Sequence, residues 1–111
     1  MIARVRKTYS FSASHETPSG VYGHNYRMEV VLDGQPSEAA AASERVRAGL
    51  ISAIHSKDLS RGAGPFSGGV LDDATIARTL ARAAVELARP VPVASVCVRR
   101  NDDDAIEVLF P

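Results

Sequence analysis

The residues of this chain most suited to chemistry lie in two short motifs. Residues 11–15 read Phe-Ser-Ala-Ser-His and residues 23–26 read Gly-His-Asn-Tyr, so the motifs contain two of the three histidines, His15 and His24. Histidine is the commonest metal ligand among side chains and also titrates near neutral pH. Two histidines brought together by a short hairpin are candidate metal ligands, and a metal site normally needs a third protein ligand.

Both motifs lie in segments that alternate as half-buried strands do. Apolar and aromatic side chains fall on odd positions in residues 3–15 and on even positions in residues 22–32, and only Lys7 breaks the first pattern. A period of two indicates antiparallel strands with one covered face. The segment Glu16 to Val21 contains the turn residues Pro, Ser and Gly, so the two strands are predicted to form a hairpin.

The middle of the chain has the pattern of two helices. Ser37 is expected to cap a helix that runs to about Ser56. A glycine-rich loop over residues 60–69 follows. Asp72 or Asp73 is then expected to cap a second helix. Its predicted inner stripe consists of Ile76, Leu80, Ala84 and Leu87, and Arg89-Pro90 ends it.

Two further strands are predicted over residues 91–99 and 105–110, joined by an Asn-Asp-Asp-Asp turn. The element order is therefore β-β-α-α-β-β. Strands at both ends with helices between them predict an α+β fold, with an antiparallel sheet that carries both helices on one face. We expect a single domain over residues 1–111.

Composition excludes several classes of function. The chain has 111 residues with 45% hydrophobic and 23% charged residues, and its formal net charge is zero. A neutral chain is not expected to bind nucleic acid or an anionic membrane by bulk electrostatics. It contains no run of about 20 apolar residues, which a transmembrane helix needs, and its first residues lack a signal-peptide core. With the single Cys97, we expect a cytoplasmic protein.

The two motifs and the element order resemble the 6-pyruvoyl-tetrahydropterin synthase and 6-carboxy-tetrahydropterin synthase family. The first motif is similar to the family's Phe-Ser-Ala-x-His and the second to its His-Gly-His-x-Tyr. The resemblance implies the T-fold (tunnelling fold), in which subunits complete a β-barrel as a homo-trimer and two trimers stack into a homo-hexamer. It also implies a lyase that holds zinc with three histidines and binds a dihydroneopterin triphosphate-type small molecule at a subunit interface.

The metal ligands match this family pattern only in part. His15 and His24 correspond to two of the three zinc histidines, and Tyr22 stands where the first histidine of His-Gly-His is expected. A phenol binds metal only after losing a proton whose pKa is normally about 10. Water, Tyr22 or Glu16 is left to complete the metal shell. The family's catalytic cysteine is absent, because residues 17–20 contain no thiol.

The family's remaining catalytic and binding motifs are also altered. In an ungapped comparison, His55 and Ser56 occupy the positions of its Asp-His pair, whereas a shift of one residue puts His55 at the histidine position and Ile54 at the aspartate position. With Tyr22, His55 and Ser56 are the catalytic candidates. A role for His55 as a cation at a helix C-terminus is the alternative. Arg100 and Asn101 stand near the family's pterin-anchoring Glu-Thr pair, and arginine cannot accept hydrogen bonds from a donor-rich pterin edge. Candidates for substrate binding are Tyr26, Arg100 and Phe11.

Three hypotheses of function follow. In the first, the chain is a pterin-synthase-like lyase that uses His15 and His24 with zinc to act on a pterin or a related small molecule. In the second, a diverged cyclase or isomerase uses the same interface pocket without metal. In the third, the fold persists as a non-catalytic binding protein. The histidine motifs favour the first two hypotheses, and the missing cysteine, Asp-His and Glu-Thr residues favour the second over the first.

Overall fold

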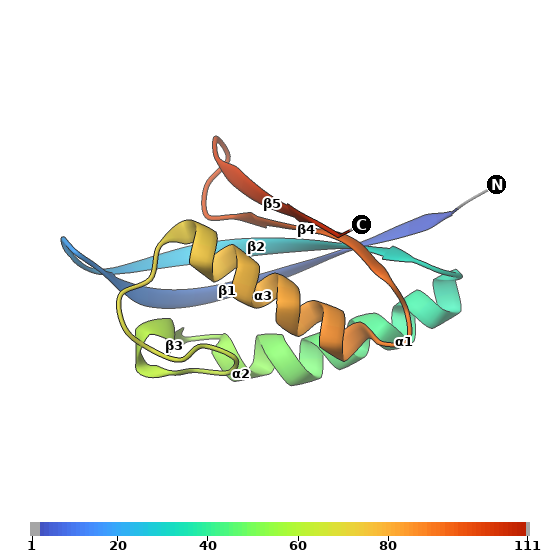
Figure 1. Cartoon of the computed structure of the whole chain (residues 1–111), viewed down its shortest axis with the longest axis horizontal. Coiled ribbons are helices and arrows are strands. Elements are labelled where there is room, and N and C mark those ends of the chain that lie inside the picture. The colour runs from blue at the N-terminus through green and yellow to red at the C-terminus, as the bar shows by residue number, and fades with distance from the viewer. Residues whose placement is uncertain (1–2, 111) are drawn as a thin grey trace.

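The computed structural model describes residues 3–110, which form one mixed sheet with helices packed on one face (Figure 1). The sheet has five strands in the order β3-β1-β2-β4-β5. A core of aliphatic and aromatic side chains lies between the sheet and the helices. The α+β class and the placement of helices on one face are as the sequence predicts, and the order of the longer elements agrees as well.

The long first hairpin is confirmed. Strands β1 (Arg4–Thr17) and β2 (Gly20–Asp33) pair antiparallel along their whole length. Their odd and even apolar positions share the face that the helices cover, because directly opposed residues point to the same side of a sheet. Only Pro18 and Ser19 separate the strands, so the connection is shorter than predicted. Gly20 makes this possible with a φ of 131°, which other residues rarely adopt.

The first helix begins two residues earlier than the sequence predicts. Helix α1 spans Pro36–Val46, and its N-cap is Gln35. Ser37 lies inside the helix, so its predicted capping role is wrong. Proline at the first helical position fixes the required φ and lacks an N–H that would need a partner. The helix continues as a π-helical turn, η1 (Arg47–Ile51), and a short segment, α2 (Ser52–Ile54).

A fifth strand follows where the sequence predicts none. Strand β3 (Lys57–Asp58) pairs parallel with Ala13 and Ser14 of β1, and a 3-10 turn, η2 (Leu59–Arg61), comes next. The sheet is therefore mixed, and the expectation of a wholly antiparallel four-stranded sheet is wrong. Two residues are too few to show an alternating pattern.

The second half of the chain agrees with prediction. Helix α3 spans Asp73–Ala88, and the Asp72 carboxylate accepts a hydrogen bond from the Thr75 N–H at 2.7 Å. Strands β4 (Val93–Arg99) and β5 (Ala105–Leu109) form the last hairpin. Gly49 allows α3 to approach η1 closely, because a Cβ there would lie 2.6 Å from Leu87 Cδ2. None of the helices in residues 3–110 is long and apolar enough to span a membrane.

Arg45 holds the two long helices together. Its guanidinium donates to three carbonyl oxygens at the C-terminal end of α3, those of Leu87, Ala88 and Arg89, at 2.8–2.9 Å. These carbonyls have no partner within the helix, and a cation also opposes the negative end of the helix dipole.

Arg45→Ala is expected to lower the free energy of unfolding by about 1–2 kcal/mol, because three charge-assisted hydrogen bonds are lost. Urea denaturation followed by circular dichroism measures this change. Arg82→Ala is the matched control, since Arg82 is exposed on α3. Its effect is expected to stay within about 0.5 kcal/mol. Equal effects of the two substitutions would contradict a capping role for Arg45.

Candidate active site

A pocket of about 370 Å³ lies at the mouth of the first hairpin. Strands β1 and β2 contribute His15, Tyr22 and His24, and the turn after β4 contributes Arg100 and Asn101. The register pairs His15 with Tyr22 and Ala13 with His24, so the three side chains from the hairpin point to the same face. The structure thus brings together both predicted metal ligands, one predicted catalytic residue and one predicted substrate-binding residue.

The two histidine rings lie side by side. Their centroids are 5.8 Å apart and their planes are tilted by 36°. Tyr26, two residues after His24, packs edge-on against the His24 ring with centroids 5.7 Å apart. Because zinc–nitrogen bonds are about 2.1 Å long, rings at this spacing are close enough to contact one ion or one water.

His15 is the buried member of the pair. Its exposed fraction is 2%, and its Nδ1 lies 3.2 Å from the hydroxyl oxygen of Tyr26. Burial lowers the pKa of His15 below its ordinary value of 6.5, and the nearby His24 and Arg100 lower it further against the opposing charge of Asp73. The imidazole is therefore neutral at pH 7. Burial also raises the pKa of Tyr26 to about 12, so its hydroxyl keeps its proton.

The second nitrogen of His15 is available to a ligand. Within residues 3–110, no buried side-chain nitrogen or oxygen lacks a hydrogen-bond partner. No partner within that range contacts Nε2, so this atom reaches the surface of the pocket that His15 lines. When Nδ1–H donates to the Tyr26 oxygen, Nε2 presents a lone pair to the pocket. Phe11 fixes the Tyr26 ring by stacking on it, with centroids 5.2 Å apart.

Arg100, which lines the pocket, forms an ion pair with the start of α3. Arg100 Nη1 lies 3.1 Å from an oxygen of Asp73, the first residue of α3. Each side chain is 39% exposed, so solvent screens the pair. Asp73 belongs to the surroundings of His15 but was expected only as a helix cap. Its position at the start of a helix gave no separate signal for a role at the pocket.

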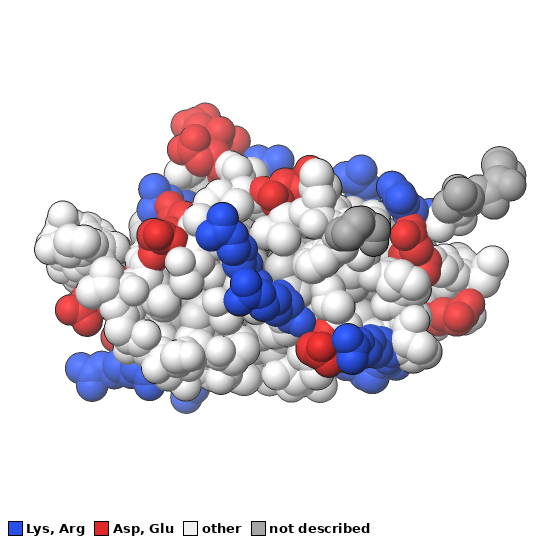
Figure 2. All heavy atoms as spheres, in the orientation of Figure 1, with Lys and Arg blue, Asp and Glu red and all other residues white. Residues whose placement is uncertain are grey.

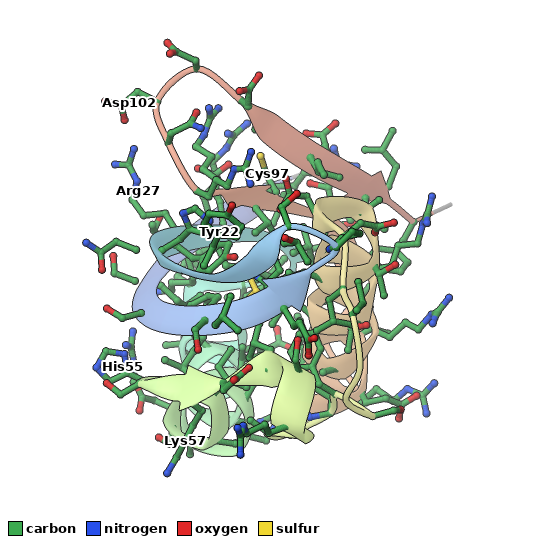
Figure 3. All side chains as sticks on the ribbon, turned by 90° about the vertical axis from the view of Figure 1, so that its left-hand side faces the viewer. Tyr22, Arg27, His55, Lys57, Cys97 and Asp102 are labelled. Carbon is green, nitrogen blue, oxygen red and sulfur yellow. The ribbon has the colours of Figure 1, made fainter. Side chains whose placement is uncertain are left out.

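The other two catalytic candidates lie elsewhere. His55 follows α2 at the outer edge of β1, where its Nδ1 accepts a hydrogen bond from the Ser12 N–H at 3.1 Å. Ser56 donates its own N–H to the Ser12 oxygen and adopts a φ of 61°. Figure 3 shows His55 near the β3 edge, away from Tyr22. Within one chain, His55 and Ser56 do not line the pocket of His15 and His24.

Solved structures with the same architecture include pterin synthases. The 6-pyruvoyl tetrahydropterin synthase of Caenorhabditis elegans superposes with a TM-score of 0.74 at 15% identity, covering 100% of this chain and 97% of that one. The chain has the fold of the 6-pyruvoyl tetrahydropterin synthases. No protein-family model matches the chain, and no curated protein matches it by sequence.

Two other structures share this synthase fold. An uncharacterized protein from Wolinella succinogenes has a TM-score of 0.72 at 13% identity, covering 100% of this chain and 99% of that one. A Plasmodium vivax 6-pyruvoyltetrahydropterin synthase, in a variant whose catalytic glutamate is replaced by alanine, has a TM-score of 0.71 at 14% identity, with 97% of each chain covered. The similarity spans the whole domain, while the low identity limits it to the fold.

The residues of the pocket do not make a complete zinc site. A catalytic zinc ion has three protein ligands, and the pocket supplies two imidazoles with Tyr22 as the third candidate. Tyr22 is 46% exposed and carries a phenol, which must lose its proton to bind metal. Among residues 3–110, no three His, Cys, Asp or Glu side chains are grouped so that they could hold an ion. The donor set therefore does not fit a resident zinc ion.

Proposed function

We propose that the hairpin-mouth pocket is the active site of an enzyme that acts on a pterin or a related small molecule by proton transfer through His15. One observation carries this proposal: a buried neutral imidazole has one nitrogen fixed by Tyr26 and the other facing a pocket. A general base needs this arrangement, because it must be unprotonated near neutral pH and within reach of the substrate. The synthase fold supports the class of substrate.

In this proposal one residue is the general base, and the others orient it, exchange protons with it or bind the ligand. His15 Nε2 accepts a proton from a C–H or O–H group of the bound molecule and returns it to another atom of that molecule. The phenol of Tyr26 orients the ring and stays neutral, since its pKa is about 12. His24 lies close enough to exchange a proton through a water. Arg100 and Asn101 contact polar groups of the ligand from the opposite side.

This proton transfer differs from chemistry that uses a glutamate or a cysteine. The Plasmodium vivax enzyme has a catalytic glutamate, whereas neither glutamate nor cysteine lines this pocket among the described residues. Glu16 follows His15 on β1 and points to the other face of the sheet. The two-nitrogen donor set and the absence of these groups favour a diverged isomerase or cyclase over the standard lyase reaction.

The test is a screen of reduced and oxidised pterins and related heterocycles, including dihydroneopterin triphosphate. Product formation is followed by chromatography for the wild type and for His15→Gln. Turnover of at least one compound by the wild type and its loss in the variant are expected. Binding without turnover in both proteins would instead support a non-catalytic binding protein.

The open sheet edges support the expected assembly. Strand β3 covers only Ala13 and Ser14 of β1, so the outer edge of residues 4–12 carries no partner strand within residues 3–110, and β5 forms the opposite edge. Exposed edges promote pairing between chains. A homo-trimer or homo-hexamer is therefore expected at micromolar concentration, with the pocket near a subunit interface. Light scattering measures the mass, and a monomer would contradict the assembly.

A further inference from the structure

A second concave site lies on the sheet face that the helices leave open. It encloses about 430 Å³, and its polar side chains come from β1, β2, the end of β4 with the turn that follows it, and His55 at the edge of β1. They include Ser10, Ser12, Asn25, Arg27 and Arg99. The polar side chains from β1 and β2 here have the opposite parity to His15, Tyr22 and His24, so they lie on the opposite face of the hairpin. Phe11 and Tyr26, which also line the site, belong to the face of His15.

Two arginines stand directly opposite each other in this site. Arg27 of β2 and Arg99 of β4 are register partners, and both are exposed. Side chains in such positions have Cβ atoms about 4.5–5.5 Å apart, and like charges there are destabilising. Two other arginines of this face, by contrast, each form an ion pair with a carboxylate of β2. Arg4 pairs with Asp33 at 2.7 Å, and Arg6 pairs with Glu29 at 3.0 Å.

The counter-charge for the arginine pair is incomplete. Arg27 Nη2 lies 3.2 Å from an oxygen of Asp102, a turn residue whose side chain is 94% exposed. Figure 3 shows these two side chains on the same side of the sheet, and Figure 2 shows acidic atoms gathered at the β4–β5 turn. Arg99 makes no ion pair with any residue from 3 to 110. Glu29 also approaches the two arginines, but Arg6 already binds it.

Hydrogen-bond donors gather beside the arginines. Ser12 Oγ donates to Asn25 Oδ1 at 2.8 Å, which leaves both hydrogens of the Asn25 amide for a ligand. Ser10 is the cross-strand partner of Arg27 and adds a hydroxyl. Two guanidinium forks, an amide and a hydroxyl offer more donors than the two oxygens of a single carboxylate accept. A phosphate group has enough oxygens to accept from all of them.

We propose that this open-face site binds a phosphate-class anion between Arg27 and Arg99, with Asn25 and Ser10 at its side. Asp102 is the counter-ion of Arg27 in the free protein, and the ligand replaces it when it binds. Arg100 and Asn101 line both this site and the proposed catalytic pocket, whereas His15, Tyr22 and His24 line only the catalytic pocket. Binding of the anion therefore does not require the proposed reaction at His15.

Calorimetric titration with inorganic pyrophosphate at low salt tests this site. Arg99→Gln and Arg27→Gln are expected to weaken binding by about tenfold or more, because each removes charge-assisted hydrogen bonds. Asp102→Asn is expected to strengthen it severalfold, since a competing carboxylate is removed. Arg4→Gln is the matched control, because it removes the same charge from the same face far from the site, and it is expected to bind as the wild type does.

Three results would overturn the proposal. They are absence of pyrophosphate binding by the wild type, equal weakening by Arg4→Gln and Arg99→Gln, and tighter binding of a dicarboxylate such as malonate than of pyrophosphate. His15→Gln is expected to retain full pyrophosphate affinity, which separates this site from the proposed active site. Thermal melting of each variant checks that it is folded, and these exposed positions are expected to tolerate substitution.

Discussion

His15→Gln is expected to lower the turnover of the substrate by about a hundredfold or more, the usual contribution of a general acid–base group. Glutamine keeps a polar group near Tyr26 but cannot take up a proton. The variant therefore removes proton transfer while a side chain of similar size still fills the position. Steady-state kinetics give the effect on kcat and on KM. Because the group acts on the reacting atoms, kcat is expected to fall while KM changes little.

Two further variants make the His15 experiment specific. Tyr26→Phe removes the hydroxyl that holds Nδ1 and is expected to cause a smaller loss, since the imidazole remains but is less well oriented. Ser14→Ala changes the neighbouring residue on the opposite face of β1 and is expected to leave kcat unchanged. A variant of His15 that keeps full turnover would remove proton transfer through this residue from the mechanism.

The environment of His15 also predicts a direction for the pH dependence. Burial lowers the pKa of His15 below 6.5 in the folded protein. Between that lowered pKa and 6.5 the unfolded chain binds more protons, so stability is full above pH 6.5 and falls as the pH drops through this interval. The acid limb of kcat/KM is expected below pH 6.5 for the same reason. In His15→Gln, the loss of stability with acid is expected to become smaller.

The sequence predicts the fold and the main pocket where apolar residues recur with a regular period, because those residues must be buried on one face. A one-residue slip of β1 or β2 would move its whole apolar set to the open face, so alternation predicts that His15, Tyr22 and His24 share one face. The exact register also depends on the length of the turn. The same face assignment places Tyr26 on the face of His15, but its register partner is Phe11, so the sequence does not predict the contact between Tyr26 and His15. The shared face is local to the hairpin, and the alternation within the two motifs contains the information for it.

Other features depend on contacts between distant segments and give no local signal. Strand β3 exists because Lys57 and Asp58 meet the free edge of β1, and a two-residue strand has no pattern of its own. The place of Asp73 beside Arg100 depends on how α3 is set against the end of β4. His55 matched a family motif by spacing alone, whereas the structure places it at the β1 edge. The spacing of a motif says which residues are close in the sequence. Which residues from distant segments come into contact depends on how the elements pack.

Tyr22→His is expected to raise the affinity for zinc by about tenfold or more, since even outer-shell partners of a metal site contribute tenfold to a hundredfold. Tyr22 lies opposite His15 in the register and two residues before His24, so a histidine there points to the same face as both. The new imidazole supplies the third neutral nitrogen that the pocket lacks, with a fourth position left for water.

Calorimetric titration of tag-free wild type and Tyr22→His with zinc measures the difference. Tyr22→Phe is the matched control, because it removes the hydroxyl without adding a donor and is expected to bind zinc no more tightly than the wild type does. A rise only in Tyr22→His would show that the two histidines keep a geometry suited to metal. Equal affinities in all three proteins would show that His15 and His24 are not preorganised for an ion, and would favour the metal-free proton transfer proposed for this pocket.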